Sequence, residues 1–352
     1  MITIVIPTYN EREVIISTID KIILTLGKTY KYEIIVTDDD SPDKTWELVQ
    51  KTYKGNSSVK VLRRVKKKKG LAPSVIEAFE KSKGDVLVVT DADAQHDLSK
   101  IPALIENSKN ADIVIGSRFI PGGSVKGWSK SRIFISKVAA LMAKPLLNQN
   151  VSDPMSGFFL IKKKLYNKIK KDINPEGYKL LLEFLFVAPY VRLSEVPYRF
   201  GLRKKGESKL GGKVIKEYLK MLIRELWSQY GKFIRFCIVG GSGVVVNIGL
   251  LYLLTEFGGL YYLFSSALAI ETSIITNFIL NNYWTWKNKH KGFFNRLVKF
   301  NLVSLVALVI NIGILFFMTE IMGVWYILSN LIGILISMLI NFWFNDKWTF
   351  KK

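Results

Sequence analysis

The chain has 352 residues, of which 49% are hydrophobic, yet 51 lysines and arginines outnumber 29 acidic residues and give a formal net charge of +22. Basic residues crowd the first part of the chain and long apolar runs follow residue 233, so the charge indicates anionic lipid or phosphorylated substrate rather than nucleic acid. The single cysteine, Cys237, lies in an apolar run, which excludes a disulfide framework and a cysteine-based zinc site.

The N-terminal segment alternates apolar strands with helices. Its first apolar run, 1–7, is too short for a signal peptide and lacks a basic leader, so we expect this domain to stay in the cytosol. Strands are expected at 2–6, 33–36, 59–62 and 85–89, and helices at 11–26, 45–53 and 71–82. This order predicts an α/β fold with a parallel, doubly wound sheet, in which ligands bind beyond the carboxyl ends of the strands.

Acidic clusters follow two of these strands. Asp91-Ala92-Asp93 comes after the fourth strand, where alternate carboxylates suit one Mg²⁺ or Mn²⁺ ion that bridges a diphosphate. Gln95 is placed to add a neutral oxygen ligand, whereas the ring nitrogen of His96 suits a hard cation less well. An Asp-x-Asp pair alone is a weak signal, and its place at a strand end makes it a candidate metal site.

The other cluster, Asp38-Asp39-Asp40, follows the second strand. Carboxylates at such a position accept hydrogen bonds from a base or a ribose hydroxyl, and the alternative is a capping cluster for the helix after Ser41. Three residues past the first strand are expected to line the same crevice: Pro7, Tyr9 and Glu11. The chain has no glycine-rich dinucleotide fingerprint and no phosphate-loop lysine, so kinase, ATPase and dinucleotide-binding functions lack support.

The pattern changes between residues 212 and 232 to that of a basic amphipathic helix. Val214, Tyr218, Leu222 and Leu226 recur at every fourth position, with lysines and an arginine between them. Together with Trp227, this pattern fits a helix that lies in a membrane interface, and the alternative is an ordinary helix packed on its own domain. The apolar runs that follow favour the interface.

Four apolar spans make up the rest of the chain. Each is near the length that crosses a bilayer, about 20 residues. They lie at about 233–257, 261–279, 300–318 and 324–344. We therefore expect a cytosolic domain at 1–211, an interfacial linker helix at 212–231 and an all-helical membrane domain at 232–352.

The spans form an internal repeat. A shift of 64 positions aligns, without a gap, Asn247-Ile248-Gly249 with Asn311-Ile312-Gly313 and Trp284-Thr285 with Trp348-Thr349. A unit of two spans returns the chain to its starting side, so the repeat predicts two parallel helical hairpins. Glu271 stands out because a carboxylate within a bilayer is costly and marks a functional site by default, and its repeat partner is Leu335.

The loops predict the orientation of the spans. The basic residues near the span ends flank the side that faces the N-terminal domain: Lys232, Arg235, Lys287, Lys289, Lys291, Arg296, Lys299, Lys351 and Lys352. The hairpin turns on the other side carry Glu256 and Glu320 and no lysine or arginine. The positive-inside rule therefore places both termini in the cytoplasm.

The ordered motifs resemble those of family-2 glycosyltransferases and, among them, the dolichol-phosphate mannose synthases. The matching residues are Ile6-Pro7-Thr8-Tyr9-Asn10-Glu11, 38–45, Asp91-Ala92-Asp93, Gly116-Ser117-Arg118-Phe119, Gly127-Trp128-Ser129 with Arg132 and Ser136, and Ser152-Asp153-Pro154-Met155-Ser156-Gly157-Phe158. The resemblance covers roughly residues 1–230 and departs at Thr37, where the family often has an apolar residue. Residues 233–352 resemble small four-span proteins found with lipid-linked sugar transfer.

This resemblance implies a GT-A fold and an inverting, metal-dependent transfer of mannose from GDP-mannose to dolichyl (polyprenyl) phosphate at the cytoplasmic membrane face. The nucleotide-sugar would be bound by Pro7, Tyr9, Glu11, Val36, Asp38, Asp39, Asp91, Ala92, Asp93, Arg203, Lys204 and Lys209. The acceptor phosphate would be bound by Arg118, Arg132 and Ser136, and Mg²⁺ or Mn²⁺ by Asp91, Asp93 and Gln95. Asp93, Arg118, Arg132 and Ser136 are the expected catalytic residues, and no obligate protein partner is implied.

The residues fit this chemistry independently. A lipid monophosphate has a second pKa of about 6 and is already anionic at neutral pH, so it needs no general base. The chain accordingly has only two histidines, His96 and His290. Holding two phosphates together requires cations, and arginine binds phosphate oxygens in a bidentate manner.

Several alternatives stay open at this stage. UDP-glucose would serve the same mechanism, and a flippase regulated by a nucleotide-sugar would also need the spans. A processive polysaccharide synthase usually carries a Gln-x-x-Arg-Trp motif, which is absent. Lys66-Lys67-Lys68-Lys69 is expected to be a solvated or membrane-facing run, and residues 133–147 a second interfacial helix. Asp153 and Glu183 are expected either to orient the sugar or to pair with arginines.

Overall fold

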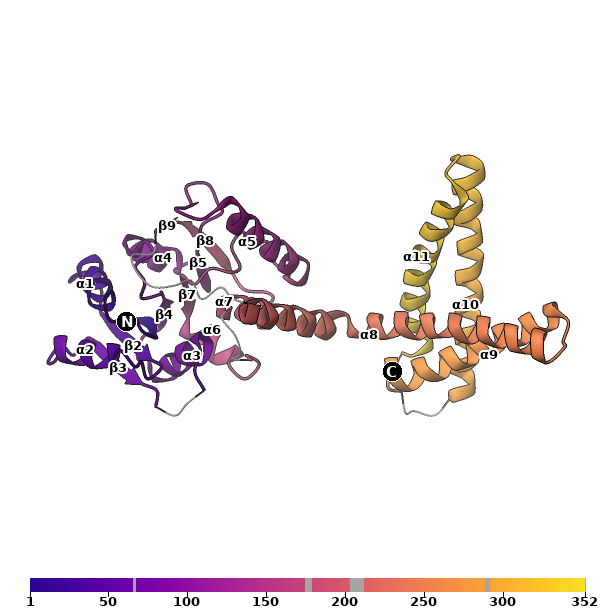
Figure 1. Cartoon of the computed structure of the whole chain (residues 1–352), viewed down its shortest axis with the longest axis horizontal. Coiled ribbons are helices and arrows are strands. Elements are labelled where there is room, and N and C mark those ends of the chain that lie inside the picture. Colours follow the sequence, from indigo (N-terminus) through magenta and orange to yellow (C-terminus); the bar gives the residue numbers. More distant parts are fainter. Residues whose placement is uncertain (66–67, 175–178, 203–211, 289–291, 352) are drawn as a thin grey trace. The chain divides into compact units, whose positions relative to one another are not determined.

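The computed structural model describes residues 1–65, 68–174, 179–202, 212–288 and 292–351 (Figure 1). The chain divides into two compact units, Met1–Glu225 and Leu226–Lys352. The first unit is an α/β domain and the second is helical.

A seven-stranded sheet forms the centre of the first unit. Its strands are β1 (Ile2–Thr8), β2 (Tyr32–Asp38), β3 (Val59–Arg63), β4 (Val86–Val89), β5 (Ile113–Ser117), β7 (Phe159–Lys162) and β8 (Leu193–Pro197), in the order β3-β2-β1-β4-β7-β5-β8. A parallel pair, β6 (Ser124–Val125) and β9 (Arg199–Phe200), forms a separate small sheet. The four strands expected from the sequence are β1 to β4, and they are parallel neighbours, as predicted.

The sheet is mixed rather than parallel throughout, which corrects the prediction. Strand β7 is antiparallel to both of its neighbours, β4 and β5. It is only four residues long and enters the sheet after α5 and a long loop rather than through a strand-helix-strand crossover. The first four strands carry the expected crossover helices, so the prediction was right for them and wrong for the other half of the sheet.

Helices cover both faces of the sheet (Figure 1). They are α1 (Ile15–Leu26), α2 (Thr45–Thr52), α3 (Leu71–Lys81), α4 (Ile101–Asn107), α5 (Lys130–Ala143), α6 (Lys163–Ile169) and α7 (Leu180–Val187). Alternate residues of β1 point to opposite faces, as the period of two requires. Ile4 and Ile6 pack with α1, α2 and α4, whereas Val5 packs with α3, α6 and α7.

The predicted amphipathic helix is the first part of a single long helix, α8 (Gly212–Tyr252). Tyr218, Met221 and Leu222 are buried against α5 and α7, and the Tyr218 hydroxyl donates a hydrogen bond of 2.5 Å to the carbonyl of Ala139. Ile223, on another face, is 63% exposed. One face of the helix therefore packs on its own domain, and the other presents apolar side chains outward.

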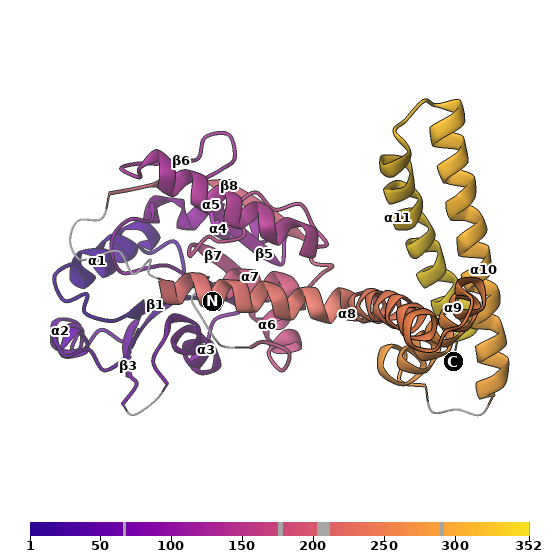
Figure 2. The ribbon, with the colours of Figure 1, turned by 45° about the vertical axis from the view of Figure 1, so that its right-hand side comes forward.

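The second unit consists of helical hairpins. After α8 come α9 (Tyr262–Leu280), α10 (Phe293–Phe316) and α11 (Tyr326–Phe344), each of which continues into a π-helical turn: η4 (Asn281–Thr285), η5 (Phe317–Ile321) and η6 (Asn345–Thr349), with η3 (Leu253–Phe257) after α8. Four helices of the described chain are long and apolar enough to span a membrane, as predicted. Helices α10 and α11 lie side by side in both views (Figures 1 and 2).

The two halves of the repeat make reciprocal contacts. Lys232, before the first span, pairs with Asp346 at 2.8 Å, and its repeat equivalent Arg296 donates to Asn282 at 3.1 Å, the equivalent of Asp346. Trp286 stacks on its own equivalent, Phe350, with ring centres 4.3 Å apart. Such exchange between equivalent positions is what a two-fold relation between two copies of one hairpin produces.

Helix packing within the first hairpin depends on Gly243. A Cβ atom there would lie 2.2 Å from the Asn277 amide on α9, whereas a Cβ at Gly240 would meet nothing within 4 Å. We predict that Gly243→Leu lowers the free energy of unfolding by about 1–3 kcal/mol through overpacking, and that the control Gly240→Leu does not. Thermal unfolding of the detergent-purified protein measures this, and equal midpoints for the two variants would contradict the packing.

Candidate active site

The predicted acidic clusters lie at one edge of the sheet. Thr8 of β1 is in register with Asp38 of β2, and β4 ends at Val89, two residues before Asp91. Because β2, β1 and β4 are parallel neighbours, their carboxyl ends meet at this edge. The fold therefore brings together the residues that the sequence analysis selected after three different strands.

Asp38 organises the turn after β2. Its Oδ2 atom accepts hydrogen bonds from the hydroxyls of Thr8 (2.9 Å) and Ser41 (2.7 Å), and its Oδ1 atom accepts one from the Ser41 backbone N–H (2.7 Å). Burial raises the pKa of this carboxyl, although those hydrogen bonds oppose the rise. Asp43 instead meets the start of α2, where it accepts from the Thr45 N–H at 2.9 Å. The start of α2 is thus met by Asp43, which the capping alternative did not name, while Asp38 fixes the loop.

Asp39 is held by a residue that the sequence analysis missed. Arg64 is buried and donates to Asp39, to Glu77 (3.1 Å) and to the Lys68 carbonyl (3.0 Å). The second oxygen of Asp39 accepts from the Gly70 N–H at 2.7 Å. Arg64 lies at the start of a basic run, and the sequence analysis did not distinguish it from the other residues of that run. The usable signal was that a carboxylate buried after β2 needs a cation, and that β3 ends beside β2.

The remaining predicted donor residues differ in what they can offer. Tyr9 is partly exposed, and the Lys69 ammonium lies 4.9 Å from its ring centre. Val36 and Ala92 are buried, so their backbone rather than their side chains would face a ligand. Pro7 and Glu11 lie at the end of β1 and just beyond it. The predicted residues Arg203, Lys204 and Lys209 lie outside the described residues, as do Lys66, Lys67 and His290.

The segment after β4 forms a tight turn that carries the metal candidates. Ala94 has a φ of 59°, and Asp93 accepts a hydrogen bond of 3.1 Å from the Gln95 backbone N–H. The Gln95 side-chain amide donates to the Gly201 carbonyl at 3.0 Å, and the Gly201 N–H donates back to the Gln95 carbonyl at 2.7 Å. The turn is therefore fastened to the end of β9.

The donor set fits a metal ion that is shared with a substrate. Within the described residues no group of three or more acidic, histidine or cysteine side chains could hold an ion alone. Asp91 and Asp93 are alternate carboxylates, and the Asp91 side chain is 35% exposed. Mg²⁺ and similar ions are commonly bound by one or two carboxylates plus substrate phosphates, so two carboxylates suffice here.

His96 supports this turn from the protein interior, a role that the sequence analysis did not assign. Its ring is buried among Phe158, Tyr198 and Phe200, and burial lowers its pKa to about 4. Nδ1 accepts a hydrogen bond of 3.1 Å from the Asp91 backbone N–H, which leaves the proton on Nε2, 3.6 Å from the Asp91 carboxylate. The neutral ring thus holds the backbone of Asp91 in place and lies next to its carboxylate.

The predicted acceptor residues gather around Trp128. The Arg118 and Arg132 guanidinium carbons lie 5.3 Å and 4.3 Å from the Trp128 ring centre. Ser136 stands one turn beyond Arg132 on the same face of α5. The buried Trp128 indole N–H has no hydrogen-bond partner within the described part of the chain.

Arg118 is not a loose cation, because Asp153 fixes it. Its Nε and Nη2 atoms each donate to the buried Asp153 carboxylate at 2.7 Å. Glu183 likewise pairs with Arg224 and accepts from the Asn174 N–H at 2.9 Å. Asp153 and Glu183 were expected either to orient the sugar or to pair with arginines, and the geometry confirms the pairing with arginines.

Lys179 is a second residue that the sequence analysis missed. It directly precedes α7 and interacts electrostatically with Arg118, Asp153, Asp91 and Arg132. Burial, and then the neighbouring Arg118, lower the pKa of its ammonium. No motif surrounds it, and only the fold brings it to this edge from a distant part of the sequence.

Comparisons with known proteins agree with this architecture. Residues 3–170 match the model of glycosyl transferase family 2, and residues 235–350 match that of the GtrA/DPMS transmembrane domain. A dolichol-phosphate mannosyltransferase of Pyrococcus furiosus is 41% identical over 99% of both chains. One of Saccharomyces cerevisiae is 38% identical over 64% of this chain and 86% of its own. A crystal structure of glucosyl-3-phosphoglycerate synthase from Mycobacterium tuberculosis with Mn²⁺ and UDP is 20% identical, covers 66% of this chain and 80% of its own, and has a TM-score of 0.47.

The contacts of His96 generate a prediction about metal binding. We expect His96→Ala to weaken Mn²⁺ binding in the presence of GDP by about 10- to 100-fold, because Asp91 loses its support. His96→Asn keeps an acceptor for the Asp91 N–H and should recover part of the loss. Mn²⁺ titration followed by electron paramagnetic resonance measures both, with circular dichroism as the control for folding. Wild-type affinity in the alanine variant would show that the ring only fills space.

Proposed function

The chain belongs to the family of the dolichol-phosphate mannosyltransferases, multi-pass membrane enzymes of glycosyl transferase family 2, and we propose that it transfers mannose from GDP-mannose to dolichyl or another polyprenyl phosphate. The relative that matches along almost the whole chain supports both the sugar and the lipid acceptor. The observation that carries the proposal is the proximity of a carboxylate pair to an arginine pair, since Asp91 interacts electrostatically with the buried Arg118.

The arginine pair suits an acceptor phosphate. Asp153 accepts from Nε and Nη2 of Arg118, which leaves Nη1 outside that ion pair. The Arg132 guanidinium lies over the Trp128 ring, which Arg118 also contacts. Arginine binds phosphate oxygens with strong, charge-assisted hydrogen bonds, and the Ser136 hydroxyl adds a neutral donor. A phosphate oxygen bound there attacks the anomeric carbon of mannose, the bond to the donor diphosphate breaks, and the anomeric configuration inverts.

The carboxylate pair suits the donor diphosphate. We propose Asp91, Asp93 and Gln95 as the residues that hold Mg²⁺ or Mn²⁺, which when bound neutralises charge on the diphosphate. The loop held by Asp38 and Asp39 lies along the same edge and would bind the nucleoside together with Pro7, Tyr9 and Glu11. Arg203, Lys204 and Lys209 follow β9 in the sequence and are proposed to neutralise the leaving diphosphate.

Helix α5 suits a membrane surface. Phe134, Ile135 and Leu141 are exposed on it, between Lys130 and Lys144. Exposed apolar side chains bordered by lysine are typical of a helix in the headgroup region. With both termini and this domain on the cytoplasmic side, as the basic loops indicate, α5 would present the lipid phosphate to Arg132, on the same helix.

A transfer assay tests the proposal. Protein in detergent with dolichyl phosphate and Mn²⁺ or Mg²⁺ should move label from GDP-mannose into the lipid phase, and Asp93→Asn should lower the rate by about 100-fold or more because the diphosphate loses its counter-charge. The control Asp172→Asn changes an exposed carboxylate and should leave the rate unchanged. If label reaches the lipid phase from UDP-glucose alone, the donor is UDP-glucose and the mechanism is unchanged. If both nucleotide-sugars stay intact, the result favours a flippase regulated by a nucleotide-sugar.

Arg132 provides a test of the acceptor site alone. Arg132→Gln should raise the KM for the lipid phosphate by about 10- to 100-fold through the loss of a charged hydrogen bond, with the KM for GDP-mannose unchanged. The control Lys137→Gln removes an exposed cation from the same helix and should alter neither value. An equal rise of both KM values in the Arg132 variant would contradict its assignment to the acceptor.

A further inference from the structure

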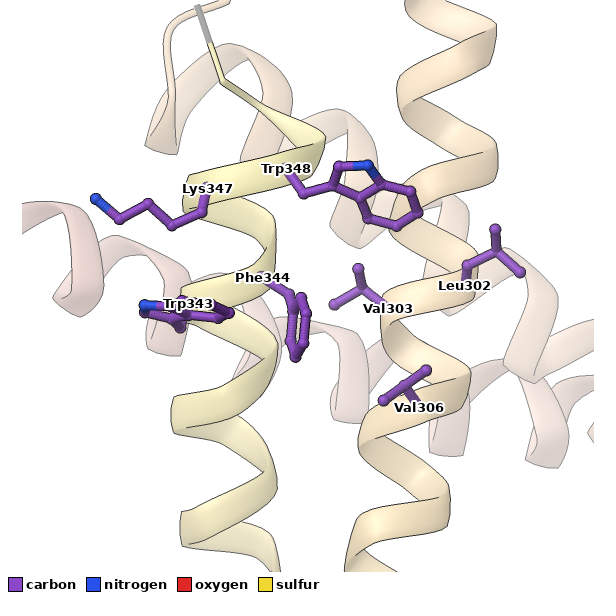
Figure 3. Close-up of a pocket in the computed structure, with 7 residues that line it drawn as sticks. All are labelled: Leu302, Val303, Val306, Trp343, Phe344, Lys347 and Trp348. Atoms are coloured by element: carbon purple, nitrogen blue, oxygen red, sulfur yellow. The ribbon is translucent and has the colours of Figure 1, made fainter.

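A groove lies between α10 and the end of α11 in the second hairpin (Figure 3). Its volume is about 460 Å³. The lining residues are Leu302, Val303 and Val306 of α10, Trp343 and Phe344 of α11, and Lys347 and Trp348 of η6. Every one of them except Lys347 is apolar or aromatic, so the groove offers a hydrocarbon surface with one ammonium.

The groove opens to the outside of its hairpin. Leu302 is 48% exposed and Trp343 is 57% exposed, although α10 and α11 are spans that a bilayer would surround. A dry, open apolar surface in a membrane contacts hydrocarbon chains of lipid rather than water. The occupant is therefore a lipid molecule, and the remaining question is which headgroup it carries.

Two cations stand at one end of the groove. Lys347 and Trp348 lie at the same end in Figure 3, and Val306 lies at the other. The Lys299 ammonium lies 5.2 Å from the Trp348 ring centre. No carboxylate in the described part of the chain forms an ion pair with Lys299 or Lys347, since neighbouring Asp346 pairs with Lys232 at 2.8 Å and accepts from the Trp286 indole at 3.0 Å. Lys347 interacts electrostatically with Asp346, but neither lysine is held in an ion pair within the described residues, so both ammonium groups can meet an anion.

The repeat shows that hairpin packing does not require this lysine. The equivalent of Lys347 in the first copy is Tyr283, and that of Val306 is Ser242. The equivalent of Lys299 is Arg235, whose guanidinium carbon lies 5.7 Å from Trp227 rather than over the equivalent tryptophan, Trp284. At these equivalent positions the second copy therefore has a lysine where the first copy has Tyr283, and a cation over a tryptophan that in the first copy lies beside a different tryptophan.

We propose that this groove is a binding site for an anionic phospholipid of the bilayer. One acyl chain follows the apolar lining, and the phosphate meets Lys299 beside Trp348. The Lys347 side chain, which extends away from Trp348 in Figure 3, turns toward the phosphate when the lipid binds. Basic residues between spans on the cytoplasmic side recognise anionic headgroups, and tryptophan at that depth belongs to the headgroup region. The site needs neither the donor nor the acceptor of the transfer reaction, so it holds whether or not the proposed function is correct.

The test measures lipid binding by the full chain. Delipidated protein is titrated with phosphatidylglycerol or phosphatidylcholine and examined by native mass spectrometry and thermal unfolding. Phosphatidylglycerol should bind and raise the unfolding midpoint, and phosphatidylcholine should not. Lys347→Ala should weaken binding about fivefold, the effect of one lysine near an anionic headgroup. Val306→Trp should abolish it by filling the channel.

The first copy of the repeat supplies matched controls. Tyr283→Ala and Ser242→Trp change the equivalent positions and should leave phosphatidylglycerol binding unchanged. Lys347 is exposed, so its substitution does not threaten the fold. Equal binding of both lipids, or equal losses in the control variants, would overturn the proposal. Binding of a polyprenyl phosphate in place of phosphatidylglycerol would also overturn it and assign the groove to the substrate.

Discussion

Buried charge has to be paired, and this requirement shapes the catalytic unit outward from the sheet edge. Arg118 and Asp153 are both buried and meet through two hydrogen bonds of 2.7 Å. Breaking such a pair by removing one partner costs about 3–5 kcal/mol, because the other charge stays buried without compensation. The pair therefore fixes the end of β5 against the loop before β7, and the Arg118 guanidinium shares the Trp128 ring with Arg132.

The same logic separates two kinds of acidic residue that look alike in the sequence. Asp39 pairs with the buried Arg64 and accepts from the Gly70 N–H, so it orders the loop after β2 from within the protein. Asp91 is partly exposed and is supported on its inner side by a neutral ring, His96. Asp91 therefore keeps an open side, as a metal ligand shared with a substrate would need, whereas Asp39, which orders a loop, is enclosed.

These differences show which features of the fold and of the site can be predicted from the sequence. Strand periodicity located β1 to β4 and the carboxylates beyond them, because a buried strand and the polar residues after it are local patterns. The roles of His96 and Lys179 were out of reach because each depends on a partner distant in the sequence or on packing, whereas the need of a buried carboxylate for a cation was a usable signal for Arg64. Strand β7 was missed for a related reason, since it is only four residues long and its pairing with β4 and β5 defines it. In the membrane domain the repeat predicted the hairpins, but not the reciprocal contacts between them.

The position of the histidines bears on the chemistry as a whole. His96 is closed in by three aromatic rings and its Nδ1 is occupied by a backbone N–H, so it has no route to a substrate hydroxyl. An acceptor that had to lose a proton would need a base at this edge. A phosphate acceptor arrives as an anion, and what it requires is cations fixed in place before it binds. Arg118, Arg132 and Lys179 could meet that requirement, with Asp91 and Asp153 among them to offset the cost of holding three cations together. In the proposed reaction this edge would attract two phosphates and keep them apart, with carboxylates and a metal ion on the donor side and arginines on the acceptor side.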